Sequence, residues 1–230
     1  MILQVKSYIR ENNFLFGELH KDNDEPALIK AIKSKEGVFS PDISNKYWYQ
    51  NGKLHRDQDQ PAIIKASGSK YWYQYGQLHR DYDRPAVVKA NGTHEWWQNG
   101  QLHRNSDNPA IIHPNGKLEW YQYGKRHRDN NPAITDSNGN HQWYVKGVRH
   151  RSSGPAIISQ DRMVWFHDGK IHRDNDEPAI INELGINEWY QNGLLHRDND
   201  MPAVVAESDG IIWYEKWYQH GKLHRVDRAP

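Results

Sequence analysis

Short runs of alternating apolar and polar residues, separated by turn residues, recur along this chain. In residues 46–56 an aromatic run, Lys-Tyr-Trp-Tyr-Gln, leads into Asn-Gly and then into a second short alternating run. Period-two alternation is typical of strands, and Asn-Gly favours a type I′ turn, because both central residues need a positive φ. Residues 57–61 are rich in Asp and end in Pro, which indicates a loop. Residues 62–65, Ala-Ile-Ile-Lys, then predict another strand.

This unit returns about every 24 residues, which is the pattern of a repeat protein. We interpret residues 1–230 as a single repeat domain of about nine units of 22–24 residues. The first unit, near residues 11–45, is degenerate and carries an insert, and the last unit is incomplete at Ala229-Pro230. The register follows a His-Arg pair that begins at His55, His79, His103, His127, His150, His172, His196 and His224, and a His-Lys pair at His20.

Departures from the unit predict local changes. Extra residues at 30–46 and before Trp217 predict surface turns. Copies that keep only the Gly of Asn-Gly, such as Tyr75-Gly76 and Tyr123-Gly124, predict a looser turn. The incomplete last unit predicts an open sheet edge, and pairing of that edge with a second copy would give a homodimer.

One unit holds only two or three short strands, which are too few for a core of its own, so neighbouring units must stack. The sequence therefore predicts an all-β fold, an elongated and twisted antiparallel β-repeat array built as a solenoid or a single sheet.

Alternation places the Trp of each unit on one face of the strands and the adjacent Tyr on the other. We expect the Trp column, with one Ile of each unit and Leu54, to be stacked core, and the repeated His to be structural. This structural ladder comprises Trp48, Trp72, Trp96, Trp120, Trp143, Trp165, Trp189 and Trp217, with His55, His79, His103, His127, His150, His172 and His196. We expect the other column to line an open binding groove formed by Tyr49, Tyr73, Trp97, Tyr121, Tyr144, Phe166, Tyr190 and Tyr218.

The charge balance narrows the choice of partner. The chain has 30 Lys plus Arg against 29 Asp plus Glu, so it lacks the long-range field that attracts nucleic acid. The basic segment at residues 30–35 is either a solvated linker or a contact loop. No apolar run approaches the roughly 20 residues of a membrane span, and residues 1–13 do not resemble a signal peptide. With no Cys to form disulfides, we expect an intracellular protein, either cytoplasmic or part of a virus particle.

The string His55-Arg56-Asp57-Gln58-Asp59 contains residue types that bind metals. Successive copies would lie roughly 10 Å apart, too far to converge on one ion. We therefore expect structural His, hydrogen-bonded to backbone or carboxylate, and no metal site. The arginines that follow the repeated His predict either an anion-binding stripe or an Arg–Asp ladder between neighbouring repeats, with partners Asp57, Asp81, Asp129, Asp174 and Asp198.

Catalytic motifs are not evident. A catalytic site needs groups that appear once and are held in different environments. We find no such Ser-His-Asp set or carboxylate pair, and no Gly-rich phosphate loop. The histidines outside the repeat pattern fall in predicted turns or strand ends without a nucleophile motif: His94, His113, His141, His167 and His220. We therefore expect a protein that is not an enzyme and uses no cofactor.

The aromatic strand, Asn-Gly, His-Arg and Pro-Ala in register resemble MORN repeats, specifically their divergent Asp-Gly-Pro-Ala variant. Residues 153–156, Ser-Gly-Pro-Ala, come closest to that signature, and the similarity covers about residues 11–230. Ordinary MORN units carry a Gly-x-Gly pair near the Pro-Ala position, so their ligands transfer poorly. The resemblance implies an antiparallel sheet used for protein assembly, of a kind found in large DNA viruses, phages and some bacteria. It implies no reaction.

We therefore expect a repeat scaffold that binds a protein partner or assembly subunits through its aromatic surface, since Tyr, Trp and Arg are favoured interface anchors. One alternative is a ligand-binding module with aromatic cages, because Trp-Tyr before a Gly turn also resembles choline- and cell-wall-binding repeats. Another is a small inhibitor or antitoxin-like protein that binds one enzyme.

Overall fold

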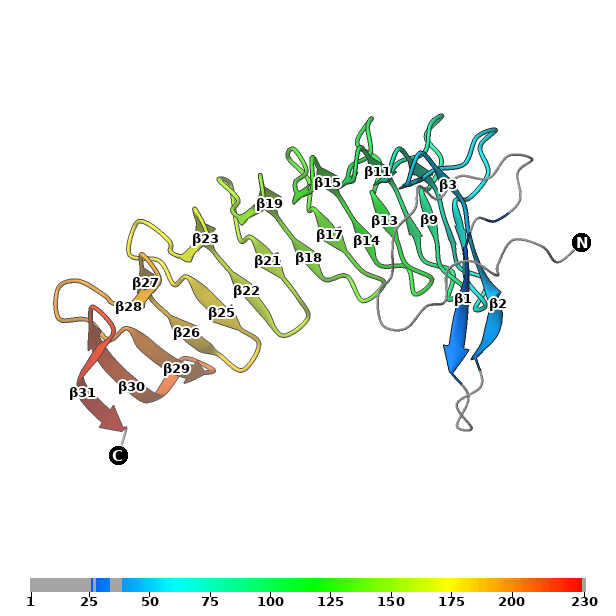
Figure 1. The fold of residues 1–230 in the computed structure, drawn as a ribbon. Helices are drawn as coiled ribbons and strands as arrows, with labels where there is room; N and C mark the ends of the chain where they lie inside the picture. The colour runs from blue at the N-terminus through cyan, green and yellow to red at the C-terminus, as the bar shows by residue number, and fades with distance from the viewer. Residues whose placement is uncertain (1–25, 27, 34–38, 229–230) are drawn as a thin grey trace, which may run out of the picture. The chain divides into compact units, whose positions relative to one another are not determined.

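The computed structural model describes residue 26, residues 28–33 and residues 39–228 (Figure 1). These residues form antiparallel strands joined by turns and loops, so the all-β prediction is confirmed. The described part contains no helix, and hence none that could cross a membrane. Most of the predicted degenerate first unit, including His20, and the chain end at Ala229-Pro230 lie outside the described residues. Two compact units, residues 1–101 and 102–230, are described separately below.

In the first unit, consecutive Ile-Ile and aromatic-run segments pair antiparallel into one sheet. The register places Tyr47 opposite Ile63, and Ile63 opposite Tyr71. The strands of this sheet are β1 (Leu28–Lys33), β2 (Phe39–Tyr47), β5 (Ile63–Ile64), β6 (Lys70–Tyr71), β9 (Val87–Val88) and β10 (His94–Glu95).

The second unit continues the same alternation, and each strand pairs with the one before it. Glu119 stands opposite both Ile111 and Ile134, so these side chains share one sheet face. The strands are β13 (Ile111–Ile112), β14 (Leu118–Glu119), β17 (Ile134–Thr135), β18 (His141–Gln142), β21 (Ile157–Ile158), β22 (Arg162–Val164), β25 (Ile180–Asn182), β26 (Ile186–Glu188), β29 (Val204–Ser208), β30 (Ile211–Gln219) and β31 (Lys222–Arg228).

After each Trp of the structural ladder from Trp48 to Trp189, the chain leaves the main sheet and forms a separate hairpin of two-residue strands, whereas Trp217 stays in the main sheet within β30. The first unit has β3 (Tyr49–Gln50) with β4 (Lys53–Leu54), and β7 (Tyr73–Gln74) with β8 (Gln77–Leu78). Strands β11 (Trp97–Gln98) and β12 (Gln101–Leu102) stand at the division between the units. The second unit has β15 (Tyr121–Gln122) with β16 (Lys125–Arg126), β19 (Tyr144–Val145) with β20 (Val148–Arg149), β23 (Phe166–His167) with β24 (Lys170–Ile171), and β27 (Tyr190–Gln191) with β28 (Leu194–Leu195).

The hairpin turns have one backbone conformation, with or without Asn. Asn51 and Gly52 have φ angles of 49° and 69°, and Tyr123 and Gly124 have 48° and 76°. The prediction of a looser turn where Asn is missing is therefore wrong. The reason is a pair of bonds to the preceding repeat: the Tyr123 amide donates to His103 Nδ1 at 3.2 Å, and the Gly124 amide donates to the Leu102 carbonyl oxygen at 2.9 Å.

Three other expectations need correction. The described parts of 30–46 lie mainly in β1 and β2, and the residues before Trp217 lie in β30, so both insertions lengthen strands rather than form surface turns alone. Residues 30–33 pair with residues 39–42, and β30 pairs with both β29 and β31, so backbone pairing holds the extra residues in the sheet. Leu54 stands directly opposite Tyr49, so it belongs to the Tyr column and not to the Trp column.

The core is thin and repeats along the chain. In the Pro-Ala pairs from Pro61-Ala62 to Pro202-Ala203 the Ala has 0% exposure, and its neighbour Ile or Val is often buried as well. In the second unit Trp120, Ala133, Ile134 and Tyr144 form one buried cluster. A larger residue than Ala would not fit where these strands approach so closely.

Candidate functional site

The repeated His joins each hairpin to the next. In the first unit, His55 Nδ1 accepts from the Tyr75 amide at 3.1 Å, and the two rings stack at 4.6 Å. Since Nδ1 accepts, the ring proton lies on Nε2, which donates to Asp57 Oδ1 at 3.0 Å. His103 repeats the arrangement in the second unit, with Tyr123 as its neighbour. The expected bonds to backbone and carboxylate occur at His55, whereas His103 Nε2 contacts the side-chain amide oxygen of Asn105 in place of a carboxylate.

Trp, Arg and Asp form a second link between repeats. The Arg80 guanidinium lies 3.8 Å above the Trp72 ring and forks onto both carboxylate oxygens of Asp59, at 2.7 and 2.9 Å. The Trp72 indole donates to the Asp59 carbonyl oxygen at 2.9 Å. Shallow clefts lie between successive Asp loops and are lined by these residue types. The hydrogen bonds from Arg80 lower the pKa of Asp59, against the smaller effect of burial.

The ladder between neighbouring repeats is thereby confirmed, but its acidic partners were predicted wrongly. In the second unit Arg128 binds Asp107, and Arg197 binds Asp176. The Asp next to each of these Arg residues turns instead to the His two positions before it, because alternate residues of an extended chain share a face. These arginines are therefore engaged inside the protein and do not form a free anion-binding stripe.

The predicted columns differ in exposure. Trp48, Trp72, Trp96, Trp120, Trp143 and Trp217 are buried, and Trp165 and Trp189 are half-buried. Of the repeated His, His55, His103 and His196 are buried, and His79, His127, His150 and His172 are half-buried. Tyr144 is buried in the core, and the remaining predicted groove residues are half-buried, namely Tyr49, Tyr73, Trp97, Tyr121, Phe166, Tyr190 and Tyr218.

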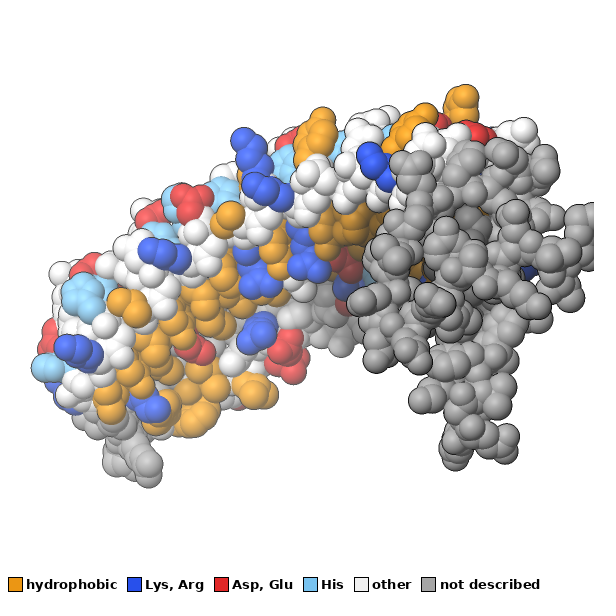
Figure 2. Space-filling view, viewed as in Figure 1, with side chains coloured by type: hydrophobic (Ala, Val, Ile, Leu, Met, Phe, Trp, Pro, Cys, Tyr) orange, Lys and Arg blue, Asp and Glu red, His pale blue; other side chains and the backbone are white. Residues whose placement is uncertain are grey.

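In the second unit the aromatic column shares its sheet face with charged residues. We call this surface the Tyr face and define it by Tyr121, Tyr144, Phe166 and Tyr190 with Glu119, Arg126 and Arg149. Figure 2 shows hydrophobic side chains gathered in a band over β25 to β30 that continues toward β14, with basic side chains among them near β18 and β21.

Glu119 is the buried acid of the Tyr face, with 4% exposure. Burial alone would raise the pKa of Glu119, but hydrogen bonds from Lys117 and His113 and the charge of Arg126 outweigh it and lower this pKa to about 2. Its ion-pair contacts are His113 Nε2 at 3.0 Å, Lys117 Nζ at 2.8 Å and Arg126 Nη2 at 3.1 Å. Glu119 is therefore ionised at neutral pH and surrounded by donors.

Arg149 has no such acid. Its Nη2 donates to two neutral oxygens, Tyr144 Oη at 2.7 Å and Gln142 Oε1 at 3.3 Å. Its buried Nε has no hydrogen-bond partner in the described part of the chain, and no carboxylate there lies within ion-pair distance of the guanidinium. The guanidinium carbon lies 5.2 Å from the Tyr144 ring centre and 4.9 Å from that of Phe166. Arg149 is thus a half-buried cation set between aromatic rings without a neutralising partner among the described residues.

Sequence analysis did not single out Arg126, Arg149 or Glu119. The signal was available, because the position opposite the face Tyr is Leu in several hairpins, at Leu54, Leu78 and Leu195, and Arg in only two. No protein-family model matches the sequence, and no curated protein matches it. The resemblance to MORN repeats stays a prediction.

Proposed function

We propose that this chain is a non-enzymatic, MORN-like repeat scaffold that binds a protein segment carrying carboxylate groups on the Tyr face of its second unit. The observation that carries the proposal is Arg149, whose guanidinium is half-buried among aromatic rings with only neutral hydrogen-bond partners in the described residues. A buried charge of this kind gains most from an opposite charge supplied across an interface.

The local charge supports an acidic partner. Lys117 and Arg126 pair with Glu119, and Arg149 has no carboxylate partner among the described residues, so the surface around Tyr121 and Tyr144 has a positive excess although the whole chain is close to neutral. The aromatic rings beside the cations offer apolar area for the rest of the segment, and Tyr and Arg together are favoured anchors of interfaces.

An aromatic cage for a cationic ligand such as choline is the weaker candidate here. Arg126 lies 5.6 Å from the Tyr121 ring centre and 5.7 Å from that of Tyr144. Arg149 lies against Tyr144 and Phe166. The ring faces that would attract a ligand cation already contact cations of the protein.

The proposal is tested by selecting peptides from a random displayed library on the wild-type protein and measuring their affinity for the wild type and for Arg149→Leu. Leu occupies the corresponding position in other hairpins, so the variant is expected to fold. We expect selected peptides to carry Asp or Glu beside apolar residues. We also expect Arg149→Leu to weaken their binding about tenfold or more, the size of one charge-assisted hydrogen bond.

Lys146→Asn is the matched control, because Lys146 lies in the exposed turn of the same hairpin and Asn is a usual residue of that turn. It removes the same charge and should leave binding unchanged. Selection of peptides without acidic residues, or equal binding to wild type and Arg149→Leu, would contradict the proposal. A stronger response to single-stranded DNA than to acidic peptides would point to phosphate as the ligand and would contradict it as well.

A further inference from the structure

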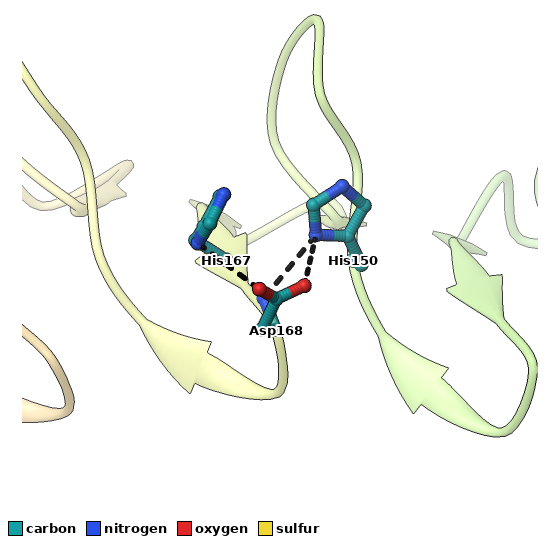
Figure 3. A group of neighbouring side chains, drawn as sticks. All are labelled: His150, His167 and Asp168. Atoms are coloured by element: carbon teal, nitrogen blue, oxygen red, sulfur yellow. Dashed lines mark hydrogen bonds and ion pairs between the residues drawn. The ribbon is translucent and has the colours of Figure 1, made fainter.

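One hairpin of the second unit brings two imidazoles and a carboxylate together (Figure 3). His167 ends β23, Asp168 lies in the turn that follows it, and His150 follows β20 of the preceding hairpin. His150 Nδ1 lies 3.3 Å from Asp168 Oδ1, and His167 Nδ1 lies 3.6 Å from Asp168 Oδ2. One ligand atom from each residue lies within 4.8 Å of the others.

His167 and Asp168 depart from the repeat pattern, and the repeated His150 lacks its usual acidic partner. Residue 167 is Gln in most other units, as at Gln122 and Gln191, and residue 168 corresponds to turn residues such as Asn192. The repeated His usually has an Asp two positions later to accept from Nε2, but residue 152 is Ser. His150 Nε2 consequently makes no hydrogen bond to any described residue, whereas His172 Nε2 in the next repeat contacts Asp174 Oδ1 at 2.9 Å.

The cluster has several hydrogen-bond acceptors and few N–H groups that donate to them. His150 Nδ1 accepts from the Asp168 amide at 3.2 Å, so its lone pair points toward the same turn that carries the carboxylate. The Asp168 carboxylate oxygens and His150 Nδ1 therefore face one another as electron-pair donors, and His167 Nδ1 lies beside them. A shared cation relieves this arrangement.

We propose that His150, His167 and Asp168 form a binding site for a divalent metal ion of borderline softness, and that Zn²⁺ fits it best. Two imidazoles and one carboxylate are the donor set that Zn²⁺ accepts, with water in the remaining position. At Zn–ligand distances of about 2.0–2.1 Å the edge of a tetrahedron is about 3.3 Å, close to the two distances above. Mg²⁺ and Ca²⁺ prefer oxygen ligands and fit this set poorly.

Binding requires only a local rearrangement. His150 Nδ1 gives up the hydrogen bond from the Asp168 amide and binds the ion instead. The His167 side chain is 63% exposed and is free to turn toward the ion. His172 does not join the site. Its ring centre lies 6.2 Å from that of His167, and its Nδ1 accepts from the Asn192 amide while Nε2 contacts Asp174.

The test is calorimetric titration of Zn²⁺ into the full chain, prepared without a polyhistidine tag, near neutral pH. The variant His167→Gln with Asp168→Asn carries the residues usual for this turn, so its fold is expected to remain, which circular dichroism checks. We expect one equivalent of Zn²⁺ to bind the wild type in the micromolar range, the double variant to lose at least tenfold in affinity, and Mg²⁺ to give no saturable heat.

The control is His220→Asn, which removes one His of the stacked His196–His220 pair. No third metal-ligating side chain of the described residues joins that pair. Its Zn²⁺ isotherm should match that of the wild type. Histidine nitrogen resonances give a second readout, and those of His150 and His167 should shift first. An isotherm unchanged by the double variant, or no saturable binding by the wild type, would overturn the proposal.

Discussion

At the scale of single residues, repeats are joined by side chains that make several contacts at once. The Asp59 backbone carbonyl oxygen accepts a hydrogen bond from the Trp72 indole, and the Asp59 carboxylate binds Arg80 and Arg84. Its φ of 55° is a conformation that Asp adopts more readily than most residues, because its short polar side chain suits it. Position, charge and backbone conformation therefore all favour Asp there.

Acid should weaken these links, and Asp107 offers a clear test. The hydrogen bonds from Arg128 lower its folded-state pKa below the ordinary 3.8. The folded chain thus resists a proton that the unfolded chain accepts. The stabilisation is complete above about pH 4 and is lost as pH falls through the lower folded-state pKa. In Asp107→Asn, the drop in urea midpoint between about pH 7 and pH 3 should be smaller than in the wild type. An equal drop would show that this pair does not contribute.

How far the residues were predictable depends on repetition. The structural role of His55 and the burial of Trp48 follow from their recurrence in register, since like must stack on like. The Asp partner of Arg80 did not follow, because it depends on a loop conformation with positive φ at both Gln58 and Asp59. The setting of Arg149 and the approach of His167 to His150 did not follow either, because these residues are departures from the repeat, and recurrence carries no information about them.

At the scale of elements, the hairpin is held mainly by its neighbour. Each hairpin turn from Tyr75-Gly76 onward gives both central amides to the preceding repeat, one to a His ring and one to a backbone carbonyl. This explains why exposed aromatic residues such as Tyr123, 70% exposed, tolerate a positive φ. The sequence predicted the two-residue turn from Asn-Gly, but it could not reveal the acceptors in the adjacent repeat that hold the same turn without Asn.

The hydrogen-bond acceptor of a repeated His can be removed while an aromatic ring is kept in its place. In His103→Phe we expect stacking on Tyr123 to persist while the Tyr123 amide loses its partner, which should cost about 1–3 kcal/mol of unfolding free energy. Urea unfolding followed by Trp fluorescence measures this change. The comparison is Asn105→Ala, which removes the exposed contact of the same ring at Nε2, 2.9 Å away, and should cost less. Equal costs would mean that the buried acceptor has no special role.

At the scale of the whole molecule, we expect function to concentrate where the repeat is interrupted. With a formal net charge of +1, the chain has little overall field, so recognition must come from local departures such as the cations of the Tyr face. The repeated residues are occupied in joining one unit to the next. Their variants, including Arg149 and the His150–His167–Asp168 cluster, are the groups left to contact something else.

The most direct test of the Tyr face is site-specific photo-crosslinking to a selected acidic peptide. A photoreactive phenylalanine analogue replaces Phe166, beside Arg149, or Val145, which is 39% exposed and follows Tyr144 on the opposite side of the strand. We predict a peptide adduct from position 166 that Arg149→Leu abolishes, and little adduct from position 145. Equal adducts from both positions, or an adduct at 166 that is indifferent to Arg149, would contradict the account.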